Sequence, residues 1–393
     1  MRRITLLLPV LFAACWDARD PLAPPRDAPA SPFIALSPPT LVISAPVDLG
    51  ALATGMGAEA YRVNNLGHAV GWGYLSTGQY HAVLWTAPGK PFDLGTLPGG
   101  AQSYALGVND VNAGCGLLCA STTVEYVVGA SEARVFSTVT RPHLETHAFR
   151  WDAKNGMIDL GTLGGAWSTA TGVNSAGNVV GISYTASGVS HAFAWSPGTG
   201  MQDLGTLGAG GESRASDLDA AGAGGASNGH VVRWSSTGVI EDMGLLPGSA
   251  PSNIGYGVNA LGWVAGAAYT NAGSSAGATH AVLWTGPNQA RDLGTLPGGV
   301  YSSANAVNDL GWVVGYELGT GRYTGFIWSD TDGMLQLPSF TPTPMVASWA
   351  NDINGGFVVG AISGSSSVFG ILHPAMWTVT QQQPPPSCVI CSL

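Results

Sequence analysis

Histidine is the side chain best suited to acid–base catalysis and metal binding near neutral pH, so its placement is informative. Six of the eight histidines stand four residues before a tryptophan: His81, His147, His191, His230, His280 and His373. A catalytic histidine is needed once, whereas one that recurs in nearly every copy of a repeat serves the architecture. We therefore predict structural histidines that hydrogen-bond to a neighbouring strand or turn. The other two, His68 and His143, do not make a metal site by themselves.

Four cysteines form two spaced pairs, Cys115 with Cys119 and Cys388 with Cys391. Four thiolates suit zinc, and two thiols separated by two residues suit a redox pair. In an exported chain disulfides are the stronger expectation. Their pairing stays open, because four cysteines allow three connectivities.

The remaining chemical motifs are weak. Asp330-Thr331-Asp332-Gly333 is similar to part of a calcium loop but lacks the other ligands, including the distal glutamate. Other copies of the repeat carry a plain glycine turn at this place, which predicts a hairpin. The sequence has no nucleophile elbow, no zinc-protease motif and no phosphate loop. We predict no catalytic residue, no metal and no cofactor.

The elements that position these residues form a repeat of four short apolar stretches. One column of the repeat reads Asn64, Asn109, Asn174, Asp219, Asn259, Asn308 and Asn354. The tryptophan column reads Trp85, Trp151, Trp195, Trp234, Trp284, Trp328 and Trp377. Asp-Leu-Gly follows each tryptophan in most copies and begins at Asp93, Asp159, Asp203 and Asp292, where we predict structural aspartates.

Four strands in about 40 to 50 residues are typical of a propeller blade. We predict an all-β, seven-bladed β-propeller with four-stranded antiparallel blades over residues 41–379. One Asp-Leu-Gly copy precedes Asn64 and none follows Trp377. The last blade therefore lacks its outer strand, and we expect residues 41–50 to supply it and close the propeller.

The two ends of the chain follow other patterns. Arg2 and Arg3, an apolar run and Ala13-Ala14-Cys15 resemble a bacterial lipoprotein signal. The resemblance implies a signal peptide over residues 1–14, lipidation of Cys15, and an exported protein, periplasmic or at the cell surface, that contacts the membrane only through this anchor. Residues 15–40 are proline-rich and predict an extended tether. Residues 380–393 form a tail rich in proline and cysteine.

The linked motifs Gly-x-Val-Val-Gly, His-Ala-Phe-x-Trp and Asp-Leu-Gly-Thr-Leu resemble those of bacterial HAF-repeat extracellular proteins. The resemblance covers roughly residues 42–379, although the copy with Gly224-Gly225 and His230-Val231-Val232 departs from the pattern. It implies an exported repeat protein and gives no catalytic residues.

Composition limits the partners. The chain has a formal net charge of -10 and no dense run of arginine or lysine, so nucleic acid is excluded as a partner. Its hydrophobic content of 45% excludes a disordered chain. We expect a monomer.

One face of the predicted propeller carries recurring aromatic residues in its variable loops. The candidate ligand-binding residues are Tyr74, Tyr184, Tyr269, Trp167 and Tyr301, with Arg134 and Phe136 from a long insertion before Trp151. Rigid rings beside small polar residues suit sugar or peptide contacts. We expect a non-enzymatic binding scaffold for a glycan or a protein.

The alternative is a propeller-type polysaccharide hydrolase or lyase. It would need two carboxylates that converge from the loops. The candidate acids are Glu59, Glu125, Glu132, Glu145, Glu212 and Glu317.

Overall fold

The computed structural model describes residues 39–111, 124–135, 143–249, 251–270, 278–319, 321–340, 347–363 and 371–382. The predictions for Cys15, Cys115, Cys119, Cys388, Cys391, Phe136 and the signal segment lie outside these residues. Within them, all regular secondary structure is β-strand. No helix among the described residues has the length and apolarity needed to cross a membrane.

The strands have the following bounds in chain order: β1 Thr40–Ile43, β2 Val47–Asp48, β3 Ala58–Val63, β4 Ala69–Tyr74, β5 Tyr80–Trp85, β6 Pro91–Asp93, β7 Ser103–Val108, β8 Val127–Val135, β9 His143–Asp152, β10 Gly156–Asp159, β11 Gly164–Val173, β12 Val179–Thr185, β13 Ser190–Ser196, β14 Gly200–Asp203, β15 Ser213–Asp219, β16 Gly222–Ser227, β17 His230–Trp234, β18 Ile240–Asp242, β19 Ile254–Val258, β20 Val264–Thr270, β21 Ala278–Trp284, β22 Ala290–Gly294, β23 Tyr301–Val307, β24 Val313–Leu318, β25 Tyr323–Ser329, β26 Gly333–Gln336, β27 Ser348–Asn354, β28 Phe357–Ser363 and β29 Leu372–Gln382.

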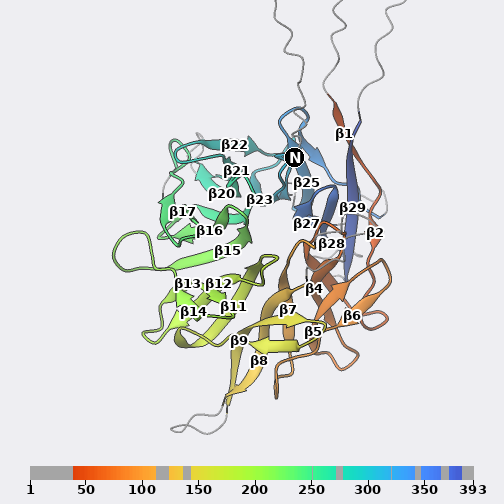
Figure 1. Cartoon of the computed structure of the whole chain (residues 1–393). Coiled ribbons are helices and arrows are strands. Elements are labelled where there is room, and N and C mark those ends of the chain that lie inside the picture. Colours follow the sequence, from red (N-terminus) through yellow and green to blue (C-terminus); the bar gives the residue numbers. More distant parts are fainter. Residues whose placement is uncertain are drawn as a thin grey trace, which may run out of the picture. The chain divides into compact units, whose positions relative to one another are not determined.

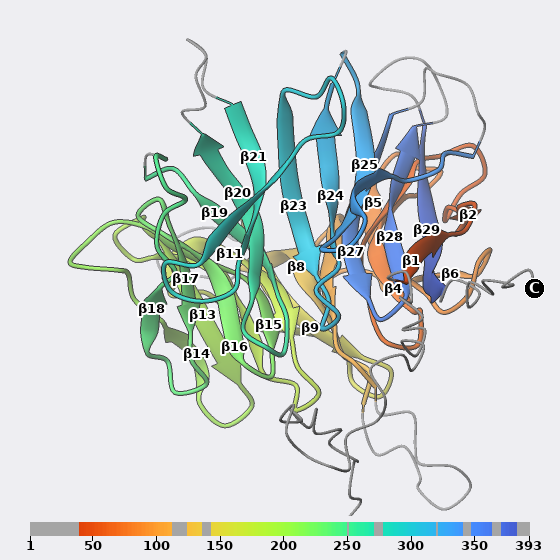
Figure 2. The ribbon, with the colours of Figure 1, turned by 90° about the horizontal axis from the view of Figure 1, so that it is seen from above.

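These strands form hydrogen-bonded sheets arranged around a common centre (Figure 1). Four sheets have four antiparallel strands each: β3–β6, β15–β18, β19–β22 and β23–β26. A five-stranded sheet joins β27, β28 and β29 to β1 and β2, and an eight-stranded sheet holds β7–β14. In the turned view, neighbouring strands β20, β21, β23 and β24 stand side by side (Figure 2). The fold is an all-β propeller.

The prediction of seven separate four-stranded sheets is wrong in part. Five sheets have the size of one blade, with four or five strands, and the sixth has eight. The cause is the insertion before Trp151, which lengthens β9. A parallel bridge between Thr146 on β9 and Trp167 on β11 then joins two groups of four strands into one sheet.

The N-terminal segment pairs with the last strand of the chain. Val47 and Asp48 of β2 lie opposite Met376 and Ala375 of β29, in antiparallel register. β1 continues this ladder, from Ile43 opposite Val379 to Thr40 opposite Gln382, so β29 extends beyond residue 379. The two ends of the described chain therefore hold each other in one sheet.

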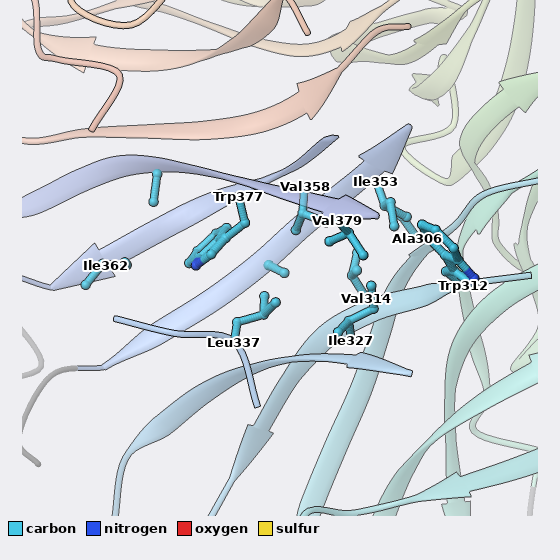
Figure 3. Close-up of a cluster of buried hydrophobic side chains, with 12 residues drawn as sticks. Ala306, Trp312, Val314, Ile327, Leu337, Ile353, Val358, Ile362, Trp377 and Val379 are labelled. Atoms are coloured by element: carbon cyan, nitrogen blue, oxygen red, sulfur yellow. The ribbon is translucent and has the colours of Figure 1, made fainter. Parts of the chain in front are cut away.

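The core lies between the sheets. Buried apolar side chains gather in seven clusters among the described residues, and each cluster draws on two consecutive groups of strands. The cluster in Figure 3 joins Val314 and Ile327 of one group to Val358 and Trp377 of the next. Each group thus buries both of its faces against neighbours, which is the main source of stability in such a fold.

The repeated tryptophans lie in these contacts. Four are almost fully buried, and each Nε1 donates to a carbonyl oxygen of the preceding group: Trp85 to Gly50, Trp234 to Leu204, Trp284 to Gly244 and Trp377 to Pro338. Trp328 is also buried, whereas Trp151 and Trp195 are partly exposed. The guanidinium of Arg150 lies over the Trp195 ring, 4.9 Å from its centroid.

Each of the six repeated histidines lies against an aspartate of the adjoining strand. The Nδ1 atoms of His81, His147, His191, His230, His280 and His373 lie 2.8–3.0 Å from carboxylate oxygens of Asp93, Asp159, Asp203, Asp242, Asp292 and Asp48 respectively. The same aspartates accept the backbone N–H of the glycine two residues on, as Asp93 does from Gly95. Each pair therefore fixes a strand to the turn that follows its partner strand.

A serine on the innermost strand links each of several groups to the one before it. Ser302 Oγ accepts the N–H of Ala281 and donates to the carbonyl oxygen of Gly294. Ser103, Ser168 and Ser213 make the same two bonds in their own groups. One hydroxyl thus satisfies two backbone groups at a buried contact.

We predict that Ser302→Ala lowers the free energy of unfolding by about 2 kcal/mol, because a buried N–H and a buried carbonyl lose their partner. Ser235→Ala is the matched control, since the hydroxyl of Ser235 bonds the Thr237 hydroxyl and accepts the N–H of Val239, both in an exposed turn. It should change the free energy by less than about 0.5 kcal/mol. Denaturant titration measures both, and equal effects would contradict a linking role.

Candidate binding site

The first strand of each group faces the centre. β3, β7, β11, β15, β19, β23, β27 and the turns after them line a cavity of about 440 Å³. The centre of the propeller is therefore hollow, and its walls are set by positions just before and after the asparagine column.

Arg62 spans this central cavity. Its Nη1 lies 3.1 Å from Asp352 Oδ1 on β27 and 3.4 Å from Asp217 Oδ2 on β15. Its Nη2 donates to the carbonyl oxygen of Ser216. Burial lowers the pKa of Arg62, but the charges of Asp217 and Asp352 outweigh it and leave the pKa raised. The guanidinium is therefore a charged link between β3, β15 and β27.

The asparagine column also links neighbouring groups. Asn64 Nδ2 donates to the carbonyl oxygen of Asn109, and Asn259 Nδ2 donates to that of Asn308. Asp219 replaces asparagine in this column. Burial raises its pKa to about 6, and the carboxylates of Asp217, Asp309 and Asp110 add to the effect. The described residues hold no cluster of three or more side chains suited to a metal ion.

Nine aromatic side chains form a connected series, which we call the aromatic arc: Tyr301, Tyr316, Tyr323, Trp349, Tyr61, Trp72, Tyr74, Tyr80 and Tyr104. In its first half, the ring centroids of Tyr301 and Tyr316 lie 6.0 Å apart, those of Tyr316 and Tyr323 5.5 Å, and those of Tyr323 and Trp349 6.4 Å. These rings run from β23 to β27.

The second half of the aromatic arc runs from β3 to β7. Trp72 Nε1 donates to the hydroxyl of Tyr61, and the Trp72 ring packs edge-on against Tyr74 and Tyr80. Tyr80 in turn lies 6.5 Å from Tyr104. All nine side chains are half-buried, so each ring is held by packing while part of it meets solvent.

Glu59 joins the two halves. Its Oε1 accepts hydrogen bonds from Trp349 Nε1, at 2.6 Å, and from Asn351 Nδ2, at 2.9 Å. Burial raises the pKa of the Tyr61 hydroxyl, and the charge of Glu59 raises it further, so Tyr61 stays a neutral phenol. A buried carboxylate with two donors is a structural anchor for the rings around it.

The structure divides the residues predicted to bind ligand. Tyr74 and Tyr301 belong to the aromatic arc. Trp167 and Tyr184 form a separate pair, with centroids 5.4 Å apart, on the eight-stranded sheet. Tyr269 is exposed on β20, outside the arc.

The insertion before Trp151 is partly strand. Glu132–Val135 of β8 pair with His143–Thr146 of β9, where we expected a loop over the binding face. Arg134 lies in this ladder, and its N–H donates to the carbonyl oxygen of Pro98. Side chains on both segments alternate between the two faces of the sheet, which allows the antiparallel pairing of β8 and β9 to extend to Val135 and His143.

Sequence reasoning missed most of the aromatic arc. Tyr104 and Trp349 stand five residues before the asparagine column, as Glu59 does, and Tyr61 stands three before it. Aligning the innermost strands on that column would have placed these side chains on neighbouring strands at similar heights. The tyrosines of β24 and β25 gave a weaker signal, because Tyr316 shares its repeat position with one other aromatic residue, Trp72, and Tyr323 shares its position with one, Tyr80.

Comparisons with known proteins show no family. No family model matches the chain, and no curated protein matches it. Among solved structures it is similar to TolB from Acinetobacter baumannii, with 12% identity over 84% of this chain and 66% of that chain and a TM-score of 0.33. It is also similar to a puromycin-hydrolyzing peptidase from Mycobacterium tuberculosis, with 13% identity over 78% of this chain and 50% of that chain and a TM-score of 0.43. A streptogramin B lyase shows 10% identity over 87% of this chain and 98% of that chain, with a TM-score of 0.42. The chain spans less than two thirds of the first two proteins, and these scores carry no argument about its activity.

We predict that Arg62→Met lowers the free energy of unfolding by about 3 kcal/mol, because Asp217 and Asp352 lose their cation in the cavity. Adding Asp352→Asn should restore part of the loss, since the amide oxygen can still accept from Val63 N–H. Thermal and denaturant unfolding measure both variants. A double variant less stable than Arg62→Met would contradict this account.

The charged cluster on β9 predicts a pH dependence. Glu145 Oε1 lies 2.7 Å from His143 Nε2 and Glu145 Oε2 lies 3.2 Å from His147 Nε2. The hydrogen bond to Asp159 raises the pKa of His147 despite burial. Burial raises the pKa values of Glu145 and Asp159, but their histidine partners lower both overall.

A histidine whose pKa is raised on folding stabilises the folded state below about pH 6.5, and this stabilisation is lost as pH rises through the folded pKa. Carboxyl groups whose pKa values are lowered on folding stabilise the folded state above about pH 4.5. The cluster should therefore stabilise most between about pH 5 and 6. We predict that His147→Gln costs more free energy of unfolding at pH 5.5 than at pH 9. Denaturant titration at both values tests this, and an equal cost would contradict it.

Proposed function

We propose that this chain is an exported, non-enzymatic binding scaffold that holds an oligosaccharide along the aromatic arc. The observation that carries the proposal is the connected series of nine half-buried rings on one face, anchored at Glu59. Such rings offer flat apolar area to the C–H faces of sugars, while their hydroxyls and the nearby amides offer polar edges.

A glycan fits this surface better than a folded protein does. Neighbouring rings within each half of the arc have centroids 5.0 to 6.5 Å apart, so the arc is an extended surface, which suits a ligand made of repeated units. Because the rings are already packed against one another, binding costs little side-chain ordering. A protein ligand remains an outcome of the test.

The hydrolase or lyase alternative has less support. Glycoside hydrolysis uses two carboxyl groups that flank the bond to be cleaved. Glu59 is the carboxylate that bonds Trp349 of the arc, and its Oε1 is engaged by two donors. An acid held in this way favours binding over proton transfer.

We also propose that the propeller has seven blades, with β2 as the outer strand of the last. The support is the seven buried clusters, of which one lies between the two halves of the eight-stranded sheet. Membrane attachment through Cys15 likewise remains a proposal, supported by the lipoprotein-like residues before it.

A glycan array and a peptide array screened with the full chain test the function. We predict that a glycan binds, and that Tyr74→Ala and Tyr323→Ala each weaken its affinity by roughly 3- to 10-fold, from the lost stacking. Tyr184→Ala is the control, because Tyr184 lies outside the arc. Binding of peptides alone, or equal losses in all three variants, would overturn the proposal.

A further inference from the structure

Three leucines are exposed in the turns that follow the innermost strands. Leu66, Leu261 and Leu310 are 41%, 57% and 66% exposed. Each is the third residue of a turn that begins at the asparagine column, as where the N–H of Gly311 donates to the carbonyl oxygen of Asn308. Exposed turns usually carry glycine, asparagine, aspartate or serine. Leucine at the same place in three turns therefore indicates a contact surface.

These turns lie at the opposite end of the strands from the aromatic arc. β23 begins with Tyr301, the first ring of the arc, and ends at Val307, just before the turn that carries Leu310. β4 follows the turn that carries Leu66 and ends with Tyr74 of the arc. The leucines therefore belong to a face that the proposed glycan site does not use.

The central cavity extends to this face. Its lining includes Asp309 and Leu310 from one turn and Ala220 from another, together with Arg62 and Asp217 from the strands. Its volume of about 440 Å³ lies within the range of ligand pockets, about 300 to 1,000 Å³. The exposed face is therefore hollowed at its centre.

Two aspartates of the cavity hold the turns of the other two leucines. Asp110 Oδ1 accepts the N–H of Asn65 at 3.0 Å, and Asp309 Oδ1 accepts the N–H of Ala260 at 2.9 Å. Each of these N–H groups belongs to the residue directly before an exposed leucine. All three leucines are thus tied to the rim of the cavity, and we call them the leucine rim.

The cavity carries an excess of negative charge. Its lining holds one arginine, Arg62, and five aspartates: Asp110, Asp217, Asp219, Asp309 and Asp352. Arg62 pairs with Asp217 and Asp352. Within the part of the chain that the structure describes, no ion pair joins Asp110, Asp219 or Asp309 to a cation. Three carboxylates near the exposed face therefore have no compensating positive charge.

These carboxylates lie within electrostatic range of one another. Burial raises the pKa of Asp219, and the charges of Asp217, Asp309 and Asp110 add to the effect. Like charges that gather in this way disfavour ionisation. A cation brought by a ligand would relieve the repulsion.

We propose that this face docks a segment of a partner protein in which a lysine or arginine lies between aliphatic residues. The basic side chain enters the cavity toward Asp219 and Asp309, and its aliphatic neighbours pack on the leucine rim. Charge complementarity sets the sign of the partner, and the exposed leucines set its apolar flanks. A small polyamine would satisfy the carboxylates but leave the leucines uncovered. This docking site is separate from the glycan site and does not rest on it.

The test uses the full chain and a library of random heptapeptides displayed on phage. Selection should enrich peptides that carry a lysine or arginine flanked by leucine, isoleucine or valine. The most enriched peptide, synthesised with a fluorescent label, then gives affinities by anisotropy. Replacing its basic residue with glutamine should weaken binding roughly 10-fold or more, because a charged hydrogen bond is lost.

Variants of the chain locate the site. Combining Asp219→Asn with Asp309→Asn should weaken binding of the labelled peptide roughly 10-fold or more. The fold should persist, because asparagine already occupies this column in other copies and can still accept the N–H of Ala260. Combining Leu261→Ser with Leu310→Ser should weaken binding roughly 3- to 10-fold, from lost apolar contact.

Matched controls change the same residue types elsewhere. Asp330→Asn alters an exposed carboxylate in the turn between β25 and β26, and Leu144→Ser alters an exposed leucine of β9. Both should leave the affinity unchanged. Tyr74→Ala and Tyr323→Ala should also have no effect, because their rings lie at the other end of the strands.

The outcomes keep this inference apart from the proposed function. If no peptide is enriched, or if the enriched peptides lack a basic residue, the docking site is wrong. It is also wrong if the two double variants bind as tightly as the controls, or if the tyrosine variants lose the peptide. None of these results bears on glycan binding, which the arrays test separately.

Discussion

The antiparallel pairing of β1 and β2 with β29 is the interaction on which the rest of the molecule depends. Each sheet of a propeller is stable because it is covered on both faces, so the circle of contacts must close. Here several contacts reinforce closure: the ladder itself, the His373–Asp48 pair and the bond from Trp85 to Gly50. Leu49, directly after β2, is buried in the cluster that joins the first and last groups.

The candidate site depends on the same closure of the propeller. One half of the aromatic arc lies on β23–β27, near the C-terminal end of the chain, and the other half on β3–β7. The hydrogen bond from Trp349 to Glu59 crosses the point of closure and joins residues far apart in sequence. The ion pair between Arg62 and Asp352 is a second link across the point of closure. A propeller opened at β29 would therefore lose the arc as a continuous surface.

Much of the fold could be predicted from sequence because the residues that build it recur. The histidine, tryptophan and asparagine columns predicted four-stranded units, and the displaced Asp-Leu-Gly copy before Asn64 predicted the N-terminal pairing. The eight-stranded sheet could not be predicted, since it depends on one bridge, Trp167 to Thr146, created by an insertion without counterpart in other copies.

The candidate site was harder to predict for the opposite reason. Binding residues differ from copy to copy, so no column marks them. Tyr74 and Tyr301 were found because their loops share a position with other aromatics, whereas Tyr316 shares its position only with the aromatic Trp72, and Tyr323 only with Tyr80. Glu59 was noted only as a loop acid, and its bonds to Trp349 and Asn351 depend on the geometry of closure.

Hydrogen exchange of the full chain, followed by mass spectrometry of its peptides, tests closure most directly. If β1 and β2 pair with β29, amides of residues 40–48 and of Leu372–Gln382 should exchange slowly and with similar protection, comparable to that of β28. The two segments should also lose protection together as denaturant is added. Rapid exchange of residues 40–48 beside a protected β28, under native conditions, would contradict the account.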